Sequence, residues 1–373
     1  MEYKKLGDIA TYINGYAFKP EQRGSEGLPI IRIQDLTGNA YDLGYYNGDY
    51  PKKVELNDGD VLISWSASLG VYLWNRGKAL LNQHIFKVVF DKVEIDKFYF
   101  MYAVEYNLDK MSLKTHGATM KHITKKDFDN VVIPYPDLNY QKEISYRLTS
   151  LKRIIKKYQE QLVLLDELIK ARFVEMFGDL RVNDKGWKYY KLDELTELIT
   201  DGEHATPKRT TQGIYLLSAR NVLNHQLSLE DVDYIDYDEF SRISRRIIPR
   251  EGDVLISCSG SIGRCCVVPK NIKFQMVRSI ALLRFKSNIN PVFAEYMITS
   301  DCLQDQINKS KTASSQANLF QGKIKSLKGV VPPLELQNQF ASFVKEIDKS
   351  RLRELLAIKQ IKLLLHDSWF LFY

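Results

Sequence analysis

The sequence predicts a mixed α/β fold: two globular domains, related by a pseudo-twofold repeat and separated by a long antiparallel helical coiled-coil spacer. Three observations support this prediction: a duplicated segment, short β-branched runs in each copy, and an apolar heptad pattern after each copy. Residues 57–70 align with residues 250–263 at an offset of 193, and nine of the fourteen positions are identical. Self-similarity at a fixed spacing is the signature of a repeated architecture.

Further segments fall into step around this duplication. We therefore expect each half to have the same fold, with globular domains at residues 1–140 and 187–333 and with loops of different length. The matched pairs are 5–9 with 191–195, 30–36 with 216–222, 83–85 with 278–280, and 136–141 with 332–337.

Each domain mixes strands and helices. The β-branched runs at 61–63 and 254–256 follow a Gly-Asp turn, which is typical of strands. Serines occur at alternate positions after each run, at 64, 66 and 68 and at 257, 259 and 261. We therefore expect each trio to face one side of a strand. Such a face suits either phosphate contact or a scaffold turn. Further strands are expected at 87–90 and 281–285, and helices at 98–106 and 292–300.

A long helix is expected after each domain, over residues 141–178 and 335–373. Between Pro136 and Gly178 the chain contains no Pro or Gly, and a helix over 141–177 would be about 55 Å long. The second helix carries Arg351 and Glu354 at the two middle seam positions. The apolar seams, spaced alternately three and four residues apart, are Ile144, Leu148, Leu151, Ile155, Tyr158, Leu162, Leu165 and Ile169, then Val344, Ile347, Ile358, Ile361 and Leu365.

An apolar seam must be buried, and the economical partner of each helix is the other helix of the same chain. Both helices leave their domains in the same sense, and the first leads to the second domain. The two copies are then related by an approximate twofold axis, with the helices antiparallel.

Composition narrows the class of protein. The 373 residues include 53 Lys and Arg against 46 Asp and Glu, a net charge of +7 that permits a nucleic-acid partner. The four cysteines form no CxxC pair, which argues against a disulfide scaffold and a structural zinc site. The amino terminus has no signal-peptide pattern, and no segment approaches the roughly 20 apolar residues of a membrane span. We expect a cytoplasmic protein without a membrane partner.

The order of the motifs carries a resemblance to a known family. Gly-Asp-Val-Leu-Ile-Ser occurs at 59–64 and 252–257, Pro-x-Leu-x-x-Gln at 136–141 and 332–337, and Phe-Val-Glu-Met-Phe-Gly-Asp at 173–179. Over essentially its whole length, the chain resembles the specificity subunit of a Type I restriction–modification enzyme. The second helix departs from this pattern, because it lacks the Met-Phe-Gly-Asp ending.

The resemblance implies a DNA-binding subunit with two target-recognition domains. Its partners would be double-stranded DNA, two modification subunits that methylate adenine with S-adenosylmethionine, and restriction subunits that use ATP and Mg²⁺. No cofactor is expected in this chain.

The sequence offers no catalytic motif of its own. There is no phosphate-binding Gly-rich loop with its lysine, no Asn/Asp-Pro-Pro-aromatic motif of adenine methyltransferases, and no metal-ligand spacing among the six histidines. We therefore expect a non-catalytic protein.

DNA recognition needs cations for phosphates and forked donor–acceptor side chains for base edges. Turn-rich polar loops and strand ends supply such residues in both halves, although each could instead be a solvated loop or a scaffold contact. The candidates in the first half are Lys19, Arg32, Gln34, Gln83, Thr119, Lys121 and His122. Those in the second half are His204, Thr206, Lys208, Arg209, Arg220, Asn221, Arg278, Ser315, Gln316 and Asn318.

Two hypotheses without catalysis follow, beside a third in which the chain is a lone nuclease or methyltransferase that would modify DNA by itself. In the first, the chain reads a bipartite, asymmetric target whose half-site centres lie about 10 bp apart, and it directs methylation and restriction by its partners. In the second, it is a coiled-coil scaffold or assembly protein whose repeated domains bind protein. A salt-dependent affinity for DNA separates them.

Overall fold

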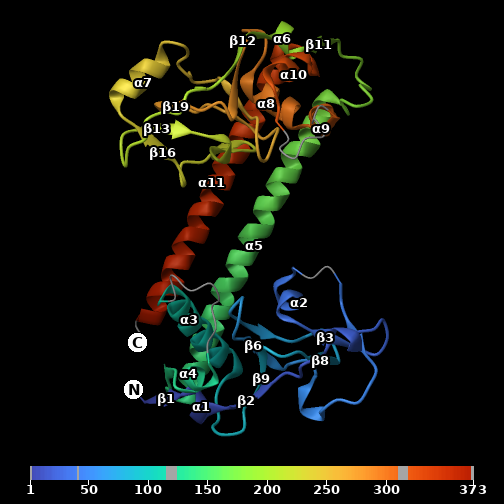
Figure 1. Ribbon diagram of the computed structural model, residues 1–373, viewed down its shortest axis with the longest axis vertical. Coiled ribbons are helices and arrows are strands. Elements are labelled where there is room, and N and C mark those ends of the chain that lie inside the picture. Colours follow the sequence, from blue (N-terminus) through green and yellow to red (C-terminus); the bar gives the residue numbers. More distant parts are fainter. Residues whose placement is uncertain (1, 40–41, 115–123, 310–317, 371–373) are drawn as a thin grey trace. The chain divides into compact units, whose positions relative to one another are not determined.

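The computed structural model describes residues 2–39, 42–114, 124–309 and 318–370 (Figure 1). The chain divides into two compact units. Unit 1 consists of residues 1–159 and 355–373, and unit 2 consists of residues 160–354. We call the globular part of unit 1 the first domain and that of unit 2 the second domain.

The first domain is built on a four-stranded antiparallel sheet in the order β2-β9-β6-β7. A second four-stranded sheet has the order β4-β3-β8-β5, and β1 pairs with β10. The strands are β1 (Tyr3–Lys5), β2 (Thr11–Asn14), β3 (Leu28–Ile31), β4 (Tyr45–Tyr46), β5 (Glu55–Leu56), β6 (Val61–Ser64), β7 (Gly70–Leu73), β8 (Ala79–Leu81), β9 (Ile85–Val89) and β10 (Val132–Pro134).

Helices close one side of the main sheet of the first domain. Tyr99 and Phe100 of α3 are fully buried in a core with Val61 and Ile63 of β6 and with Phe128 of α4. The helices of the unit are α1 (Leu6–Ile9), α2 (Ile33–Thr37), α3 (Lys97–Lys114), α4 (Lys125–Asp129) and the first part of α5 (Leu138–Phe177), with short 3₁₀ turns η1 (Pro20–Gln22) and η2 (Lys52–Val54).

The second domain has the corresponding sheet, in the order β12-β20-β17-β18. Beside it lie a three-stranded sheet in the order β16-β13-β19 and the pairs β11·β21 and β14·β15. The strands are β11 (Tyr189–Lys191), β12 (Thr196–Asp201), β13 (Ile214–Leu217), β14 (Val222–Leu223), β15 (Gln226–Leu227), β16 (Asp233–Ile235), β17 (Val254–Ser257), β18 (Cys265–Val267), β19 (Phe274–Met276), β20 (Ile280–Phe285) and β21 (Lys328–Val330).

The core of unit 2 joins the sheet to helices. Phe293 of α8, Phe177 of α5 and Phe340 of α11 are fully buried against Val254 and Ile256 of β17. The helices are α6 (Leu192–Leu195), α7 (Tyr237–Ser244), α8 (Pro291–Thr299), α9 (Asp301–Lys309), α10 (Gln321–Ser326) and α11 (Leu334–Phe370), with the 3₁₀ turn η3 (Ala219–Asn221).

The two domains share one topology, which confirms the predicted repeat. The strand order β2-β9-β6-β7 matches β12-β20-β17-β18, and each domain also contains one parallel pair, β3 with β8 and β13 with β19. The strands β1 and β11 pair in the same way with the last strand of their domain, β10 and β21.

The repeated Gly-Asp motif forms the turn that leads into β6 and β17. Gly59 and Gly252 have φ values of 92° and 82°, a conformation that glycine adopts without strain. In each turn the aspartate accepts a backbone hydrogen bond three residues upstream, at 2.8 Å for both Asp60 and Asp253. Each aspartate also pairs at 2.7 Å with a cation on the adjacent strand, Lys87 or Arg284. The motif therefore anchors the central strand of the sheet.

The serine trios do not lie along a strand as expected. The strands end at Ser64 and Ser257, so only the first serine of each trio belongs to a strand. Their hydroxyls donate to the carbonyls of Ser68 and Ser261 and close the following turn. The structure thus supports the scaffold interpretation.

The Pro-x-Leu-x-x-Gln motif joins each long helix to its own domain. Gln141 and Gln337 are buried, and each donates through Nε2 to the carbonyl of Pro136 or Pro332 at 2.8 Å. Each Oε1 accepts a backbone N–H immediately before another helix, from Asp96 at 2.9 Å or Asn290 at 2.8 Å. One amide therefore satisfies backbone groups at two helix starts.

The predicted heptad seam is present on both long helices. Along α5, the seam positions from Leu151 to Leu165 are half-buried, while most positions around them are exposed. Along α11, Arg351 and Glu354 lie in the seam, whereas Leu352 and Leu355 are 58% and 48% exposed. The residues that the heptad pattern assigns to the seam are therefore the less exposed residues of both helices in the structure.

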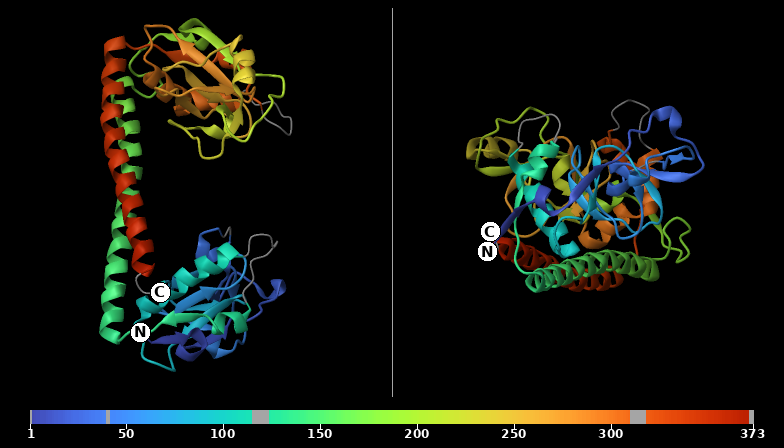
Figure 2. Two further views of the ribbon diagram at one scale, coloured as in Figure 1. Left: turned by 90° about the vertical axis from the view of Figure 1, so that its left-hand side faces the viewer. Right: turned by 90° about the horizontal axis from the view of Figure 1, so that it is seen from below.

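Within unit 2 the two helices run antiparallel, side by side (Figure 2). The rings of Phe173 and Phe340 have centroids 5.3 Å apart, and Arg351, further along α11, donates to Asp166, which is earlier on α5. Arg351 also bonds Asp348 at 2.6 Å. Antiparallel packing thus holds within this unit, with Arg351 of the seam paired to the exposed Asp166 at its edge.

Candidate nucleic-acid interface

Two backbone segments meet in the same way at one end of each main sheet. In the first domain they are the turn after β2 and the turn between β8 and β9. In the second domain they are the turn after β12 and the turn between β19 and β20. We call the place where the two turns meet the junction. Gly15 donates to the carbonyl of Ile85 at 3.1 Å, and Gly202 donates to Ile280 at 3.0 Å. An added Cβ would lie 2.0 Å from the carbonyl oxygen of Asn82 or 2.3 Å from that of Met276. This close approach requires glycine at both positions.

Gln83 and Arg278 occupy the equivalent exposed place on this junction. The backbone N–H of Gln83 donates to Tyr16, and that of Arg278 donates to Glu203, both at 3.0 Å. Both side chains are exposed, and neither has a hydrogen bond or ion pair within the described part of the chain. The structure thus presents two forked polar side chains at matched positions.

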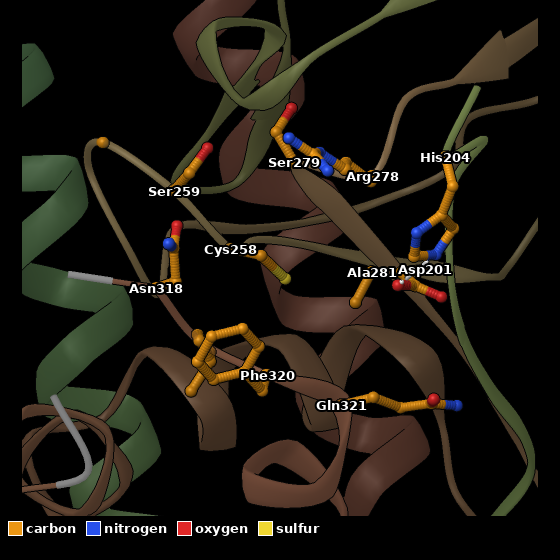
Figure 3. Close-up of a pocket in the computed structure, with 12 residues that line it drawn as sticks. Asp201, His204, Cys258, Ser259, Arg278, Ser279, Ala281, Asn318, Phe320 and Gln321 are labelled. Atoms are coloured by element: carbon orange, nitrogen blue, oxygen red, sulfur yellow. Dashed lines mark ion pairs between the residues drawn. The ribbon is translucent and has the colours of Figure 1, made fainter. Parts of the chain in front are cut away.

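In the second domain this junction borders a pocket of about 760 Å³ (Figure 3). Its lining is mainly polar and small, and it includes one exposed aromatic ring, Phe320, which is 60% exposed. Ser259 forms a backbone bridge with Asn318, which brings the segment before α10 beside the end of β17. Figure 3 shows His204, Ser259, Arg278, Asn318 and Phe320 around this pocket.

An ionised carboxylate lies at one side of the pocket. Asp201 accepts from Arg246 at 2.8 Å and pairs with His204 at 2.8 Å. Burial opposes ionisation of Asp201, but the hydrogen bond from Arg246 and the nearby charges outweigh it, and the pKa of Asp201 is lowered. The charge of Asp201 is therefore balanced by Arg246, and the contact with Asp201 holds His204 at the pocket edge.

Cys258 is the one cysteine of the pocket lining, and it is not activated as a nucleophile. Its side chain is buried at the end of β17, and burial raises the pKa of the thiol to about 12. A thiol that stays protonated at neutral pH is a poor nucleophile and a poor metal ligand. The pocket is therefore suited to binding by hydrogen bonds and stacking.

In the first domain a tryptophan stands at the place of Cys258. The backbone N–H of Trp65 donates to His84 at 3.3 Å, as that of Cys258 donates to Ser279 at 2.8 Å. The Trp65 ring packs on His84 and Phe86, with ring centroids 5.1 Å and 5.5 Å away. Aromatic side chains therefore fill the first-domain position that borders a pocket in the second.

The structure leaves several of the predicted DNA contacts available at the surface. Beside Gln83, Arg278 and His204, this group consists of Lys19, Gln34, Thr206 and Lys208, all of which are exposed, and Asn318, which is partly exposed at the pocket.

Other predicted contacts are engaged inside the fold. Arg32 is 8% exposed and bonds the buried Asp35 through Nε at 3.0 Å. Asn221 is 1% exposed, and its amide accepts from the Ser218 backbone N–H and donates to the carbonyls of Ser228 and Asp231. These two side chains stabilise turns, so we leave them out of the interface.

Arg209 and Arg220 are exposed but neutralised. Both pair with Asp233, at 3.1 Å and 3.2 Å, and Arg220 also pairs with Asp231 at 3.2 Å. A cation that is already paired offers less to a phosphate, so these two rank below Arg278. The remaining candidates, Thr119, Lys121, His122, Ser315 and Gln316, lie outside the described residues.

Sequence reasoning missed three side chains of this region: Trp65, Asp201 and Phe320. The alignment of 57–70 with 250–263 already placed Trp65 opposite Cys258 and marked a difference between the copies. Nothing in the sequence pattern brought Asp201 or Phe320 to the pocket, because their proximity depends on tertiary pairing of distant segments.

Membrane spans and metal centres are two further classes of feature that the described residues could contain. None of the described helices combines the length and the apolar character that a bilayer crossing requires. In the same residues, no cluster of three or more His, Cys, Asp or Glu side chains could hold a metal ion.

Comparison with known proteins covers nearly the whole chain. The family described as "Type I restriction modification DNA specificity domain" matches residues 1–164 and 184–363. The EcoBI specificity subunit from Escherichia coli is 24% identical, over 92% of this chain and 78% of that protein. The MjaVIII specificity subunit from Methanocaldococcus jannaschii is 22% identical, over 93% of this chain and 86% of that protein.

Solved structures show the same fold. The Type I restriction–modification S subunit from M. genitalium superposes with a TM-score of 0.56 at 13% identity, covering 98% of this chain and 94% of that one. A chain from a structure on complex assembly and conformational transition of the Type I R-M system also has a TM-score of 0.56, at 15% identity, covering 98% and 95%.

Proposed function

Since the chain belongs to the Type I restriction–modification DNA specificity family, we propose that its two domains each read one half of a bipartite, asymmetric DNA target. The observation that carries this proposal is one fold that presents different side chains at matched surface positions. The shared topology would place both domains in the same relation to DNA, and different side chains would select different bases.

The exposed polar residues supply the two kinds of contact that such a reader needs. Lys19 and Lys208 are suited to phosphates, which set affinity and its salt dependence. Gln34, Gln83, His204, Arg278 and Asn318 have hydrogen-bonding groups suited to base edges. The proposed interface of each domain therefore combines residues that contact phosphates with residues that contact base edges.

The long helices supply a surface for protein partners. Apart from the seam, α5 exposes Val163 and Leu164 at 57% and 60%, and α11 exposes Leu352 and Leu356 at 58% and 51%. Apolar side chains exposed together on a helix mark an interaction surface. We assign this surface to two modification subunits, which would methylate adenine with S-adenosylmethionine, and through them to restriction subunits that use ATP and Mg²⁺. This chain then contributes recognition without catalysis, in the cytoplasm.

Exchange of one domain tests the proposal. Residues 1–140 are replaced by the corresponding domain of a relative with a different target, and methylated sites are mapped genome-wide in a host that carries only this system. We expect one half of the methylated sequence to change and the other half to persist. A target that is continuous, palindromic or unaltered by the exchange would refute the proposal.

Binding to DNA separates this proposal from a scaffold role, which the family membership does not favour. DNA affinity of the purified chain should fall steeply with salt, with a log–log slope that reflects several phosphate contacts. Protein scaffolding predicts no such slope.

A further inference from the structure

We infer that Gln83 and Arg278 are the specificity-determining residues of one equivalent position in the two domains, with Gln83 reading adenine and Arg278 reading guanine. The inference rests on the proposed function and deepens it, because it names the base that each domain would select at this position.

The backbone around both residues is the same. The residue before each one donates to the preceding parallel strand: Asn82 to the carbonyl of Ile31 at 3.1 Å, and Val277 to that of Leu217 at 3.0 Å. The same preceding residue forms an isolated parallel bridge, Asn82 with Tyr16 and Val277 with Glu203. The Cα–Cβ vectors at 83 and 278 therefore start from matched positions.

The neighbours of Gln83 and Arg278 already have structural tasks. In the first domain Asn82 is 8% exposed and His84 packs against Trp65. In the second domain the hydroxyl of Ser279 accepts from the backbone N–H of Ala219 at 3.0 Å. Among these turn residues, Gln83 and Arg278 are the exposed ones that carry a forked amide or guanidinium group, and both are available to an outside ligand.

The two side chains have different base preferences. A glutamine amide both donates and accepts, so it can pair in a bidentate manner with N6 and N7 of adenine. An arginine guanidinium only donates, so it pairs with O6 and N7 of guanine. The pocket beside Arg278 provides depth for a base edge, whereas in the first domain Trp65 fills the equivalent place and packs on His84, the chain neighbour of Gln83.

Selection from randomised DNA duplexes by the full-length chain tests the inference. The variants are Arg278→Gln and Gln83→Arg, which exchange the two side chains between domains. The controls are Lys270→Gln and Asn75→Arg, which make the same kind of charge change at exposed residues. Lys270 and Asn75 lie in the turns near the Gly-Asp motifs, at the opposite end of β17 and β6 from the junction.

We expect Arg278→Gln to change guanine to adenine at one position of the second half-site only. We expect Gln83→Arg to make the reverse change in the first half-site only. Affinity for the original sequence should fall about 10-fold to 100-fold in each case, the usual discrimination of a bidentate base contact. Both controls should retain the wild-type consensus.

Two outcomes would overturn the inference while leaving the proposed function intact. One is a wild-type bipartite consensus that neither exchange alters. The other is a loss of affinity that is equal for all sequences and accompanied by a shallower salt slope, which would assign Arg278 to a phosphate. If the wild-type chain enriches no sequence at all, the proposed function itself fails.

Discussion

The two domains share one backbone topology but differ in the side chains that surround the junction. In the first domain Trp65 packs on His84 and Phe86, and in the second domain Cys258 stands in its place beside a pocket of about 760 Å³. Backbone hydrogen bonds between the segments recur in both copies, including at positions where the side chains differ, such as Gln83 and Arg278. The comparison teaches that backbone pairing specifies the position of the interface, while a few outward side chains specify what it binds.

The largest effect is expected when the junction itself is broken. Gly202→Ala places a Cβ 2.3 Å from the carbonyl oxygen of Met276, so the turn after β12 must move away from Arg278. We expect DNA affinity to drop more than about 100-fold, with only second half-site recognition lost in methylation maps. Gly15→Ala should do the same to the first half-site.

Gly322→Ala is the matched control for these glycine changes. An added Cβ at this position has no neighbouring atom within 4 Å, so affinity should stay within about twofold of wild type. Equal losses in Gly202→Ala and Gly322→Ala would show that backbone approach is not the cause.

Next in size is the loss of the Gly-Asp anchor, which should differ between the domains. Asp253 is 2% exposed and accepts two hydrogen bonds from Arg284, so Asp253→Ala removes a buried bidentate pair and should cost about 3–5 kcal/mol in the second domain. Asp60→Ala should cost about 1–2 kcal/mol in the first domain, because the side chain of Asp60 is 22% exposed and therefore partly solvated. Hydrogen exchange resolved by peptide measures each domain separately; equal costs would contradict the burial argument.

A smaller effect is expected from emptying the aromatic junction of the first domain. Trp65→Ala removes a half-buried ring from the contacts with His84 and Phe86, and should destabilise the first domain by about 2 kcal/mol. Exchange protection of the second domain should not change. If protection fell in both domains alike, the two cores would not be independent.

The smallest effect concerns a buried carboxyl group of the second domain that has no first-domain counterpart in the motif alignment. Glu295 of α8 is 5% exposed and lies 3.5 Å from His225. Burial raises the pKa of Glu295, although His225 acts in the opposite direction. A carboxyl with a raised pKa binds its proton more tightly in the folded state, so its contribution to stability is lost as the pH rises through the raised pKa.

Glu295→Gln keeps this side chain neutral at every pH. The variant should therefore gain stability relative to wild type as the pH increases from about 5 to about 8, measured by urea denaturation. Glu230→Gln, at an exposed position, should show no such trend. A constant difference between Glu295→Gln and wild type across this range would rule out ionisation of Glu295 as the cause.

Local patterns in the sequence predicted much of this fold. The repeat, the strand after each Gly-Asp turn and the seam with Arg351 and Glu354 depend on periodicity and turn chemistry, which neighbouring residues determine. The interface was harder to predict. Arg32 and Asn221 have side chains that could contact bases, but Arg32 pairs with Asp35 and Asn221 hydrogen-bonds to backbone groups. Whether such a side chain is free to contact DNA depends on its tertiary contacts. Residue type alone does not predict these contacts.

The ion pair between Arg351 and Asp166 in unit 2 has a consequence for sliding of the two helices. A seam of apolar residues alone tolerates a slip by one heptad, because each knob finds an equivalent hole. Here a slip of about seven residues would carry Asp166 from Arg351 to Val344 or Ile358, so Asp166 would lose its partner and Arg351 would keep only Asp348. The ion pair therefore favours one register of the two helices. Insertions or deletions in either helix at this point would have to preserve that register.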